Sequence, residues 1–324
     1  MKYIPSNFFI VLLLINCAGP GGAVTEESSN AIHNELAPLH QNLINIIDSL
    51  VQINTEIVYR TYYFHADKLY RIDELTDKKL DDLKQYSENE TFSRAGTGIV
   101  LNTDMYQTAL LTASHTVSYP DTIWHHTDHL RGHNQYVNAV SVLESIVYFV
   151  RSGSELNRFE LVENDPVNDL AILKLQKKLR NNPDFTPLNI SQGNSDNLNW
   201  GQKVYVIGYP KGHKMITSGL VSPNKGNRPG RNFIIDSSFN RGFSGGIVLA
   251  INNVKNEFEW VGMLTSASAE KETFLIPDPG TEENHNSGLL YNGDLYIGQS
   301  HRINYGIAYA VGINQVKEFM DGVQ

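Results

Sequence analysis

From Gly96 onward, short runs of apolar and β-branched residues alternate with turns rich in glycine, proline, asparagine and aspartate. Runs of this length and composition predict β-strands. The expected strands are Gly98–Asn102, Ala109–Thr112, Val142–Val150, Leu170–Leu175, Lys203–Gly208, Asn232–Asp236, Gly246–Ile251 and Trp260–Thr265. Many short strands separated by turns favour a closed or sandwiched all-β architecture.

The chain before Gly96 has a different pattern. Apolar residues recur at steps of three and four from Ile32 to Leu50, the spacing of one helix face, and Pro38 marks a first turn or a kink. We expect this helix to pack on its own domain; the alternative is a short coiled coil, for which three heptads are marginal. Ile57 to Phe64 predicts a strand, and the charged stretch Asp67 to Gln85 predicts a surface helix.

Two expectations concern the C-terminal part of the chain. Ala269 to Asn304 is a polar insertion in which Asn292-Gly293 is a hairpin signal. This insertion either gates access to a neighbouring site or is a surface loop. Gly312 to Met320 is expected to end the chain as a short helix.

Composition narrows the class of protein. The 324 residues are 41% hydrophobic and 19% charged, which is ordinary for a globular protein with a sizeable core. The formal net charge of −9 argues against a general nucleic-acid binder, which needs a basic surface. The single cysteine, Cys17, excludes an intrachain disulfide and a multi-cysteine metal site.

The N-terminus is typical of an exported protein. Lys2 precedes the apolar run Phe8 to Ile15, which is too short to span a bilayer but suits a signal peptide. Cys17 follows this run as in a bacterial lipobox, so we expect lipidation at Cys17 and a place in the periplasm or outer envelope. The alternative is an ordinary signal peptide cut after Gly21-Gly22-Ala23 and a secreted protein.

The candidate chemistry begins with a serine between glycines, in the stretch Arg241 to Gly246. A serine hydroxyl is a weak nucleophile without a base and an orienting acid. Both occur upstream, as a histidine after Leu-Thr-Ala-Ser and an aspartate before Leu-Ala-Ile-Leu. We therefore predict a triad of Ser244 as nucleophile, His115 as general base and Asp169 as orienting carboxylate. The N–H groups of Gly242 and Ser244 are expected to form the oxyanion hole.

These motifs resemble those of chymotrypsin-fold serine peptidases, most of all the HtrA-type bacterial branch. The similar segments follow the family's order from about Ile53 to Met320: Gly96–Leu101, Leu111–His115, Asp165–Lys174, Val206–Pro210, Thr217–Ser222 and Tyr305–Val311. The resemblance implies two antiparallel six-stranded β-barrels with the triad in the cleft between them, and added N-terminal and C-terminal helices.

The expected organisation has three parts. Residues 1–23 form the signal peptide or lipobox and the start of a spacer, and residues 24–52 form an N-terminal helical segment. Residues 53–324 form the peptidase domain, with a helical insertion at 67–86 and a second insertion at 269–304. The chain ends soon after this domain, so we expect no PDZ domain.

One departure from the family pattern bears on mechanism, and other positions bear on specificity. Phe243 precedes the serine where the family usually has Asp or Asn, so activation by burying a new N-terminal amine against that acid is not expected. By the resemblance, Ser238 lies at the base of the primary pocket, and Thr265, Ser266 and Ala267 offer backbone to an extended substrate. The base of this pocket has no acid, and residue 264 is leucine rather than histidine. We therefore expect a small or medium apolar residue before the scissile bond.

The functional hypothesis is an exported serine endopeptidase that acts through an acyl-enzyme on a polypeptide substrate, without a cofactor. The alternatives are a silent or gated trypsin-like fold that binds peptides at the cell surface, and an anchored protein whose insertions make the contacts. Expected partners are the substrate and a membrane, through Cys17, with no nucleic acid; a homo-oligomer through the N-terminal helix is an open alternative. His125, His129 and His133 have the spacing of a metal site on a helix, but without identifiable supporting partners we predict no metal there.

Overall fold

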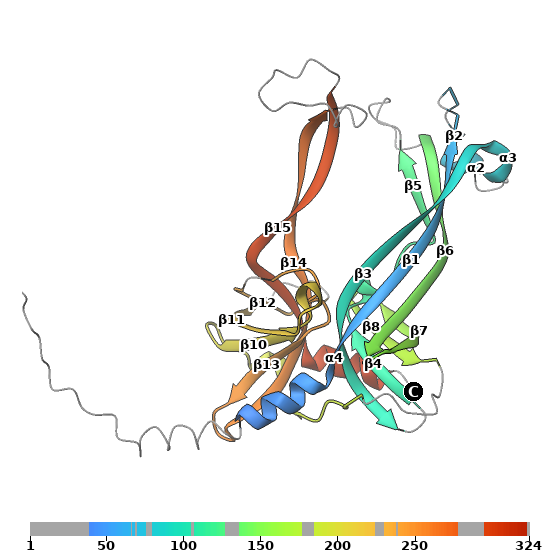
Figure 1. Ribbon diagram of the computed structural model, residues 1–324. Coiled ribbons are helices and arrows are strands. Elements are labelled where there is room, and N and C mark those ends of the chain that lie inside the picture. The colour runs from blue at the N-terminus through green and yellow to red at the C-terminus, as the bar shows by residue number, and fades with distance from the viewer. Residues whose placement is uncertain are drawn as a thin grey trace, which may run out of the picture.

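Two closed β-barrels, one after the other along the chain, make up most of the protein (Figure 1). The computed structural model describes residues 39–65, 67–68, 70–75, 80–104, 107–126, 136–176, 185–223, 230–237, 239–277 and 295–322. The polypeptide crosses from the first barrel to the second through residues 185–202, which carry little regular structure.

The first barrel has six strands in the order β1-β3-β4-β8-β7-β6, and antiparallel pairing of β1 with β6 closes it. These strands are β1 (Leu50–Phe64), β3 (Lys84–Asp104), β4 (Gln107–Thr112), β6 (Tyr136–Ser152), β7 (Glu155–Asp165) and β8 (Leu170–Leu175). Two short strands, β2 (Tyr70–Arg71) and β5 (Thr122–His126), pair with β6 outside the barrel.

The second barrel has the order β13-β10-β11-β12-β15-β14 and is closed by antiparallel pairing of β13 with β14. Its strands are β10 (Lys203–Gly208), β11 (Met215–Pro223), β12 (Phe233–Ile235), β13 (Ile247–Asn252), β14 (Glu257–Pro277) and β15 (Leu295–Gly312). A short strand, β9 (Ser191–Gln192), runs parallel to β14. The predicted all-β fold with two antiparallel six-stranded barrels is therefore confirmed.

Alternation of buried side chains explains why β1 can serve as a barrel wall. Ile53, Thr55, Ile57, Tyr59 and Thr61 are all buried, so every second residue faces the interior. Each barrel has its own apolar core, and a third core, which includes Ile99, Leu170, Ile207 and Trp260, joins the two barrels. This joint core holds the two halves of the cleft together.

Helices at both ends of the described chain pack on the joint core. Residues 39–48 are helical and bury Ile46, while α4 (Ile313–Asp321) buries Ile313 and Val316. The N-terminal helix ends earlier than predicted, because Ser49 turns the chain by donating to the Ile46 carbonyl oxygen (2.7 Å) and Leu50 already begins β1. Packing of this helix on its own domain agrees with the expectation, whereas the oligomer alternative stays a prediction.

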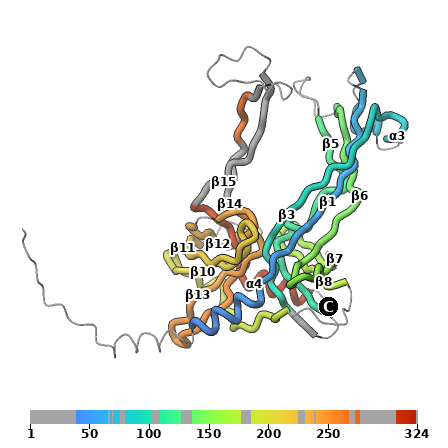
Figure 2. Tube along the Cα trace, viewed as in Figure 1, coloured from blue at the N-terminus to red at the C-terminus, as the bar shows by residue number. Residues whose placement is uncertain are grey.

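The helix predicted for Asp67 to Gln85 is confirmed in part. Among the described residues of this stretch, α2 (Ile72–Leu75) and α3 (Leu80–Leu83) are helical, whereas both ends are not, since Tyr70–Arg71 form β2 and β3 already begins at Lys84. Strand pairing overrides the local helical spacing there, because Tyr86 stacks on Tyr63 of β1 with ring centroids 4.7 Å apart. As a result β1, β3 and β6 continue beyond the barrel as a long ribbon (Figure 2).

The insertion at 269–304 also continues strands. β14 and β15 remain paired from Gly262 to Pro277, so the described part of this insertion is a second ribbon, which rises on the same side of the molecule as the first (Figure 1). The Asn292-Gly293 hairpin signal lies outside the described residues, as do Cys17 and the predicted signal peptide. Among the residues that the structure describes, no helix has the length and apolar character needed to cross a bilayer.

Candidate active site

The histidine of the site lies directly after a barrel strand. β4 ends at Thr112, and His115 follows in a single 3-10 turn, η1 (Ser114–Thr116). Buried hydroxyl groups of the first barrel hold this turn: Thr55 donates to the Thr116 carbonyl oxygen (2.9 Å) and Tyr148 donates to that of Val117 (2.7 Å). Burial raises the pKa of Tyr148, so this donor keeps its proton at neutral pH.

The aspartate lies in the turn between β7 and β8. Asp165 shapes this turn, because its carboxylate accepts hydrogen bonds from the N–H groups of Val167 and Asn168 at 3.0 Å. Asp169 then adopts φ +59°, a left-handed conformation that Asp and Asn tolerate better than other non-glycine residues. Gln315 of α4 supports the turn from outside by donating to the side-chain oxygen of Asn168 (2.6 Å).

The serine lies in a tight turn of the second barrel, just before β13. Gly242 has φ +106° and Gly245 has φ +83°, which disfavour any side chain. A Cβ on Gly242 would collide with the Tyr209 carbonyl oxygen, and one on Gly245 with that of Thr97. The two glycines are therefore required by the backbone path as well as by their φ angles.

The three predicted triad residues come together between the barrels. His115 Nε2 is 2.9 Å from Ser244 Oγ, and His115 Nδ1 is 2.8 Å from Asp169 Oδ2. Asp169 Oδ1 also accepts a hydrogen bond from the backbone N–H of His115 (2.9 Å), which orients the carboxylate. The Asp169 side chain is 20% exposed and that of His115 47%, so the acid is shielded while the imidazole faces the cleft.

The predicted oxyanion donors are available. The Arg241 carbonyl oxygen, in the peptide group that also contains the Gly242 N–H, accepts a hydrogen bond from Lys211 N–H (3.1 Å). Within the described part of the chain, the N–H groups of Gly242 and Ser244 donate to no other group. Two free donors beside Ser244 Oγ are the arrangement that binds a developing oxyanion.

A buried threonine that the sequence analysis did not single out supports this turn. Thr97, on β3, donates through Oγ1 to the Gly242 carbonyl oxygen (2.7 Å) and through its N–H to the Ser244 carbonyl oxygen (2.8 Å). Thr97 Oγ1 also accepts a hydrogen bond from Tyr209 N–H (2.9 Å). In the sequence, the only sign of this role is that Thr97 lies between two glycines of the Gly96–Leu101 segment. No local pattern predicts which groups Thr97 binds.

Phe243 anchors the same turn through its side chain. Its side chain is buried in the core of the second barrel, and its ring meets that of Phe239 edge to face with centroids 5.3 Å apart. The residue that replaces the family's acid therefore anchors the turn by apolar burial, while the backbone beside it keeps the two donors free.

The predicted substrate-binding residues differ in what they present. Ser238 lies outside the described residues. Thr265 is buried, and its hydroxyl lies within hydrogen-bonding distance of the Tyr309 carbonyl oxygen (3.2 Å), while the residue also contributes to the lining of the pocket beside Ser244. Ser266 lines a pocket of about 170 Å³ beside Ser244, together with Phe239 and Leu264. Ala267 continues β14 opposite Ala308 of β15.

Beyond Leu264, one edge of β14 has backbone groups that no described strand pairs with. β13 pairs with β14 only as far as Met263, and β15 takes the other edge. From Thr265 onward, no described strand pairs with the edge of β14 that β13 leaves. An extended peptide that adds to this edge would place its acyl-side residue in the 170 Å³ pocket.

A second and larger cleft, of about 570 Å³, also borders the nucleophile. Its lining residues are Gln52, Ser93, Arg94, Ala95, His115, Thr116, Tyr119, Lys211, Gly212, Arg241, Gly242 and Ser244. Burial raises the pKa of Tyr119 to about 12, although the nearby positive charge of Arg94 acts to lower it. The cleft also contains three cationic side chains, Arg94, Lys211 and Arg241, and the sequence analysis assigned a role to none of them.

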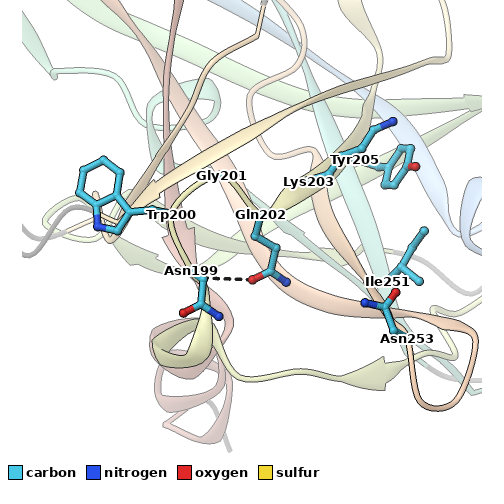
Figure 3. Close-up of a pocket in the computed structure, with 8 residues that line it drawn as sticks. All are labelled: Asn199, Trp200, Gly201, Gln202, Lys203, Tyr205, Ile251 and Asn253. Atoms are coloured by element: carbon cyan, nitrogen blue, oxygen red, sulfur yellow. Dashed lines mark hydrogen bonds between the residues drawn. The ribbon is translucent and has the colours of Figure 1, made fainter.

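Another pocket, of about 490 Å³, lies at a loop end of the second barrel and is separate from the triad (Figure 3). Its lining residues are Asn199, Trp200, Gly201, Gln202, Lys203, Tyr205, Ile251 and Asn253. The ring of Trp200 points away from the other side chains in Figure 3, and the lining holds no carboxylate or imidazole. This pocket therefore lacks the carboxylate and imidazole pair that the triad has.

The histidines considered as metal ligands do not form a helical row in the described chain. His125 lies on strand β5, and its Nε2 is hydrogen-bonded to Ser141 Oγ (2.7 Å). His129 and His133 lie outside the described residues. Within the residues that could be searched, no group of three or more His, Cys, Asp or Glu side chains is placed to hold a metal ion.

Comparison with protein families agrees with the fold. The family model of the trypsin-like peptidase domain matches residues 96–262, more than half of the chain, and this span includes His115, Asp169 and Ser244. The chain belongs to the trypsin-like peptidase family, which confirms the resemblance to chymotrypsin-fold serine peptidases. Comparison with curated proteins found no match.

Solved structures with a similar fold include three proteases or protease relatives. The active form of the Rv3671c protease from M. tuberculosis is 13% identical, with 88% of this chain and 85% of that chain covered and a TM-score of 0.42. Kallikrein-related peptidase 10 is 13% identical, with 82% and 94% covered and a TM-score of 0.35. The scabies mite inactivated protease paralogue S-I1 is 14% identical, with 86% and 96% covered and a TM-score of 0.32.

Proposed function

We propose that this chain is a serine endopeptidase that hydrolyses peptide bonds through His115, Asp169 and Ser244. The observation that supports it most is the continuous set of hydrogen bonds from Asp169 to His115 to Ser244, with two free N–H donors beside the nucleophile. A silent trypsin-like fold would not need to keep these groups aligned at hydrogen-bonding distances.

In the first half of the reaction, Ser244 Oγ attacks the substrate carbonyl carbon while its proton passes to His115 Nε2. The N–H groups of Gly242 and Ser244 hold the resulting oxyanion, and Asp169 stabilises the imidazolium. The tetrahedral intermediate collapses as the C–N bond breaks and His115 returns the proton to the leaving amine. The acyl group then remains on Ser244 as an ester.

In the second half, a water molecule replaces the departed amine. His115 Nε2 takes a proton from this water, which attacks the ester carbon and forms a second oxyanion in the same hole. Breakage of the bond to Ser244 Oγ releases the carboxylic acid, and the proton returns to the serine. The 170 Å³ pocket beside Ser266 suits a small or medium apolar residue on the acyl side.

The test of this proposal uses the purified mature chain together with Ser244→Ala and His115→Ala. We expect a fluorophosphonate probe to label the wild type alone, and unfolded casein to be cleaved by the wild type alone. Failure of a folded wild type to label would contradict the proposal and favour the alternative of a peptide-binding protein.

We also propose that the chain is exported and lipidated at Cys17. The apolar run that ends just before this cysteine supports the proposal. Expression in a bacterial host with labelled palmitate should give a labelled wild type and an unlabelled Cys17→Ser chain, and globomycin should block maturation of the wild type. An unlabelled wild type that is cut after Ala23 would instead indicate a secreted protein.

A further inference from the structure

The cleft of about 570 Å³ beside the nucleophile contains three positive charges. Arg94 comes from β3 of the first barrel, whereas Lys211 and Arg241 come from two loops of the second. All three residues are exposed, and the lining of the cleft contains no Asp or Glu. The cleft is therefore positively charged, although the chain as a whole has a formal net charge of −9.

None of these three cations forms an ion pair with any residue that the structure describes. The backbone brings two of them together, because Lys211 N–H donates to the Arg241 carbonyl oxygen (3.1 Å). Lys211 holds a left-handed conformation with φ +51°, which sets the direction of its side chain. The cleft therefore presents positive charge that no ion pair within the described part of the chain neutralises.

The position of the cleft relative to Ser244 identifies which half of a substrate it faces. The pocket of about 170 Å³ lies beside the free edge of β14, where the acyl half of an extended peptide would add. The larger cleft shares only His115, Arg241 and Ser244 with that pocket, and its other lining residues come from different segments of the chain. The residues that follow the scissile bond, which belong to the leaving amine, would lie there.

We propose that Arg94, Lys211 and Arg241 select substrates with acidic side chains within about three residues after the scissile bond. The inference rests on the proposed peptidase function. An extended chain advances by about 3.3 Å per residue, so three residues cover roughly 10 Å of cleft. Carboxylates there would meet guanidinium and ammonium groups that form no ion pair with a described residue, which favours both encounter and orientation.

The experiment compares matched quenched fluorescent peptides. Their acyl half is copied from the casein site that the wild type cuts fastest, and the second and third residues after the scissile bond are Glu-Asp, Gln-Asn or Lys-Lys. We expect kcat/KM for the Glu-Asp peptide to exceed that for the Gln-Asn peptide by about tenfold at low salt, because each exposed pair contributes only a few-fold. This ratio should fall as NaCl rises from 50 to 500 mM.

Variants assign the preference to particular side chains. Arg94→Gln removes one charge, and Lys211→Asn removes another with a residue that tolerates a positive φ. We expect the double variant to reduce the Glu-Asp to Gln-Asn ratio to about twofold or less. Arg151→Gln, which removes an exposed cation at the β6–β7 hairpin, is the charge-matched control and should keep the wild-type ratio. Comparing ratios within each variant cancels any change in overall activity.

The outcomes separate this inference from the proposed function. A wild type that labels with fluorophosphonate but cuts the Glu-Asp and Gln-Asn peptides equally well would overturn the inference and leave the peptidase function standing. A preference that survives in the double variant would overturn its assignment to these cations. A wild type that neither labels nor cleaves would overturn the proposed function, and the inference with it.

Discussion

The buried hydroxyl group of Thr97 donates a hydrogen bond to the carbonyl oxygen of Gly242 at 2.7 Å, across the boundary between the two barrels. One residue of the first barrel thereby holds the turn that carries the nucleophile of the second, since the Thr97 N–H also donates to the Ser244 carbonyl oxygen. The oxyanion turn is thus supported by a polar contact from one barrel and by the apolar burial of Phe243 in the other.

Replacing the Thr97 hydroxyl should impair catalysis without unfolding the protein. Thr97→Val leaves the Gly242 carbonyl oxygen and the Tyr209 N–H unpaired in a buried place, at a cost of about 1–3 kcal/mol. We expect kcat to fall about 10- to 100-fold with little change in KM, whereas Thr97→Ser should retain most activity. Equal kcat values for the Val and Ser variants would contradict a positioning role for the hydroxyl.

A side chain at Gly242 should abolish most activity. Gly242→Ala would place a methyl group against the Tyr209 carbonyl oxygen and force the turn to move. Because the loss of one oxyanion donor costs about 10²–10³ in kcat, we expect at least a 100-fold loss. Gly153→Ala is the control: that glycine also has a positive φ but open space around it, so only stability should fall, by about 1 kcal/mol.

Asp169→Asn should preserve the fold and remove most of the rate. Asn tolerates the φ of +59° and its oxygen can still accept the His115 backbone N–H, so thermal unfolding should change little. The amide cannot stabilise the imidazolium and favours the wrong imidazole tautomer, a change that costs about 10⁴ in kcat in a related triad. Steady-state kinetics with a residual activity within tenfold of wild type would exclude this role for Asp169.

The burial of Phe243 predicts a stability effect that depends on side-chain volume. Phe243→Ala should lower the free energy of unfolding by about 3–5 kcal/mol, because it opens a cavity beside Phe239. Phe243→Leu retains most of the apolar volume and should cost about 1–2 kcal/mol. Urea denaturation measures both values, and similar losses for the two variants would show that packing of the ring does not anchor the turn.

Tyr119 predicts a loss of stability in alkali. Its pKa is raised to about 12 by burial, whereas an unfolded tyrosine titrates near 10. Between these values the unfolded chain releases a proton that the folded chain keeps, so stability is present below pH 10 and decreases as the pH rises toward 12. For this partly buried group we expect a decrease of about 1–2 kcal/mol. Urea denaturation at pH 9.5 and 11.5 should show a smaller decrease for Tyr119→Phe than for wild type.

Much of the barrel framework was predictable from local pattern. The strands Leu170–Leu175 and Lys203–Gly208 have the bounds that the sequence predicted, because each is a short apolar run between turn residues. The helix expected over Asp67 to Gln85 was wrong at its ends, because the described residues there belong to strands β2 and β3, while its interior does contain helical turns. Pairing with β1, which lies far away in sequence, decided where β3 begins.

The sequence by itself determined the all-β architecture and the triad motifs, because strand periodicity and the glycines of a tight serine turn are local properties of the chain; the two-barrel class came from the family resemblance of those motifs. Only the tertiary structure decided that Thr97 supports the oxyanion turn and that Arg94, Lys211 and Arg241 line one cleft. Those contacts join segments from different barrels, and their distances are set by how the barrels close and pack through the joint core. No local pattern of residues carries that information.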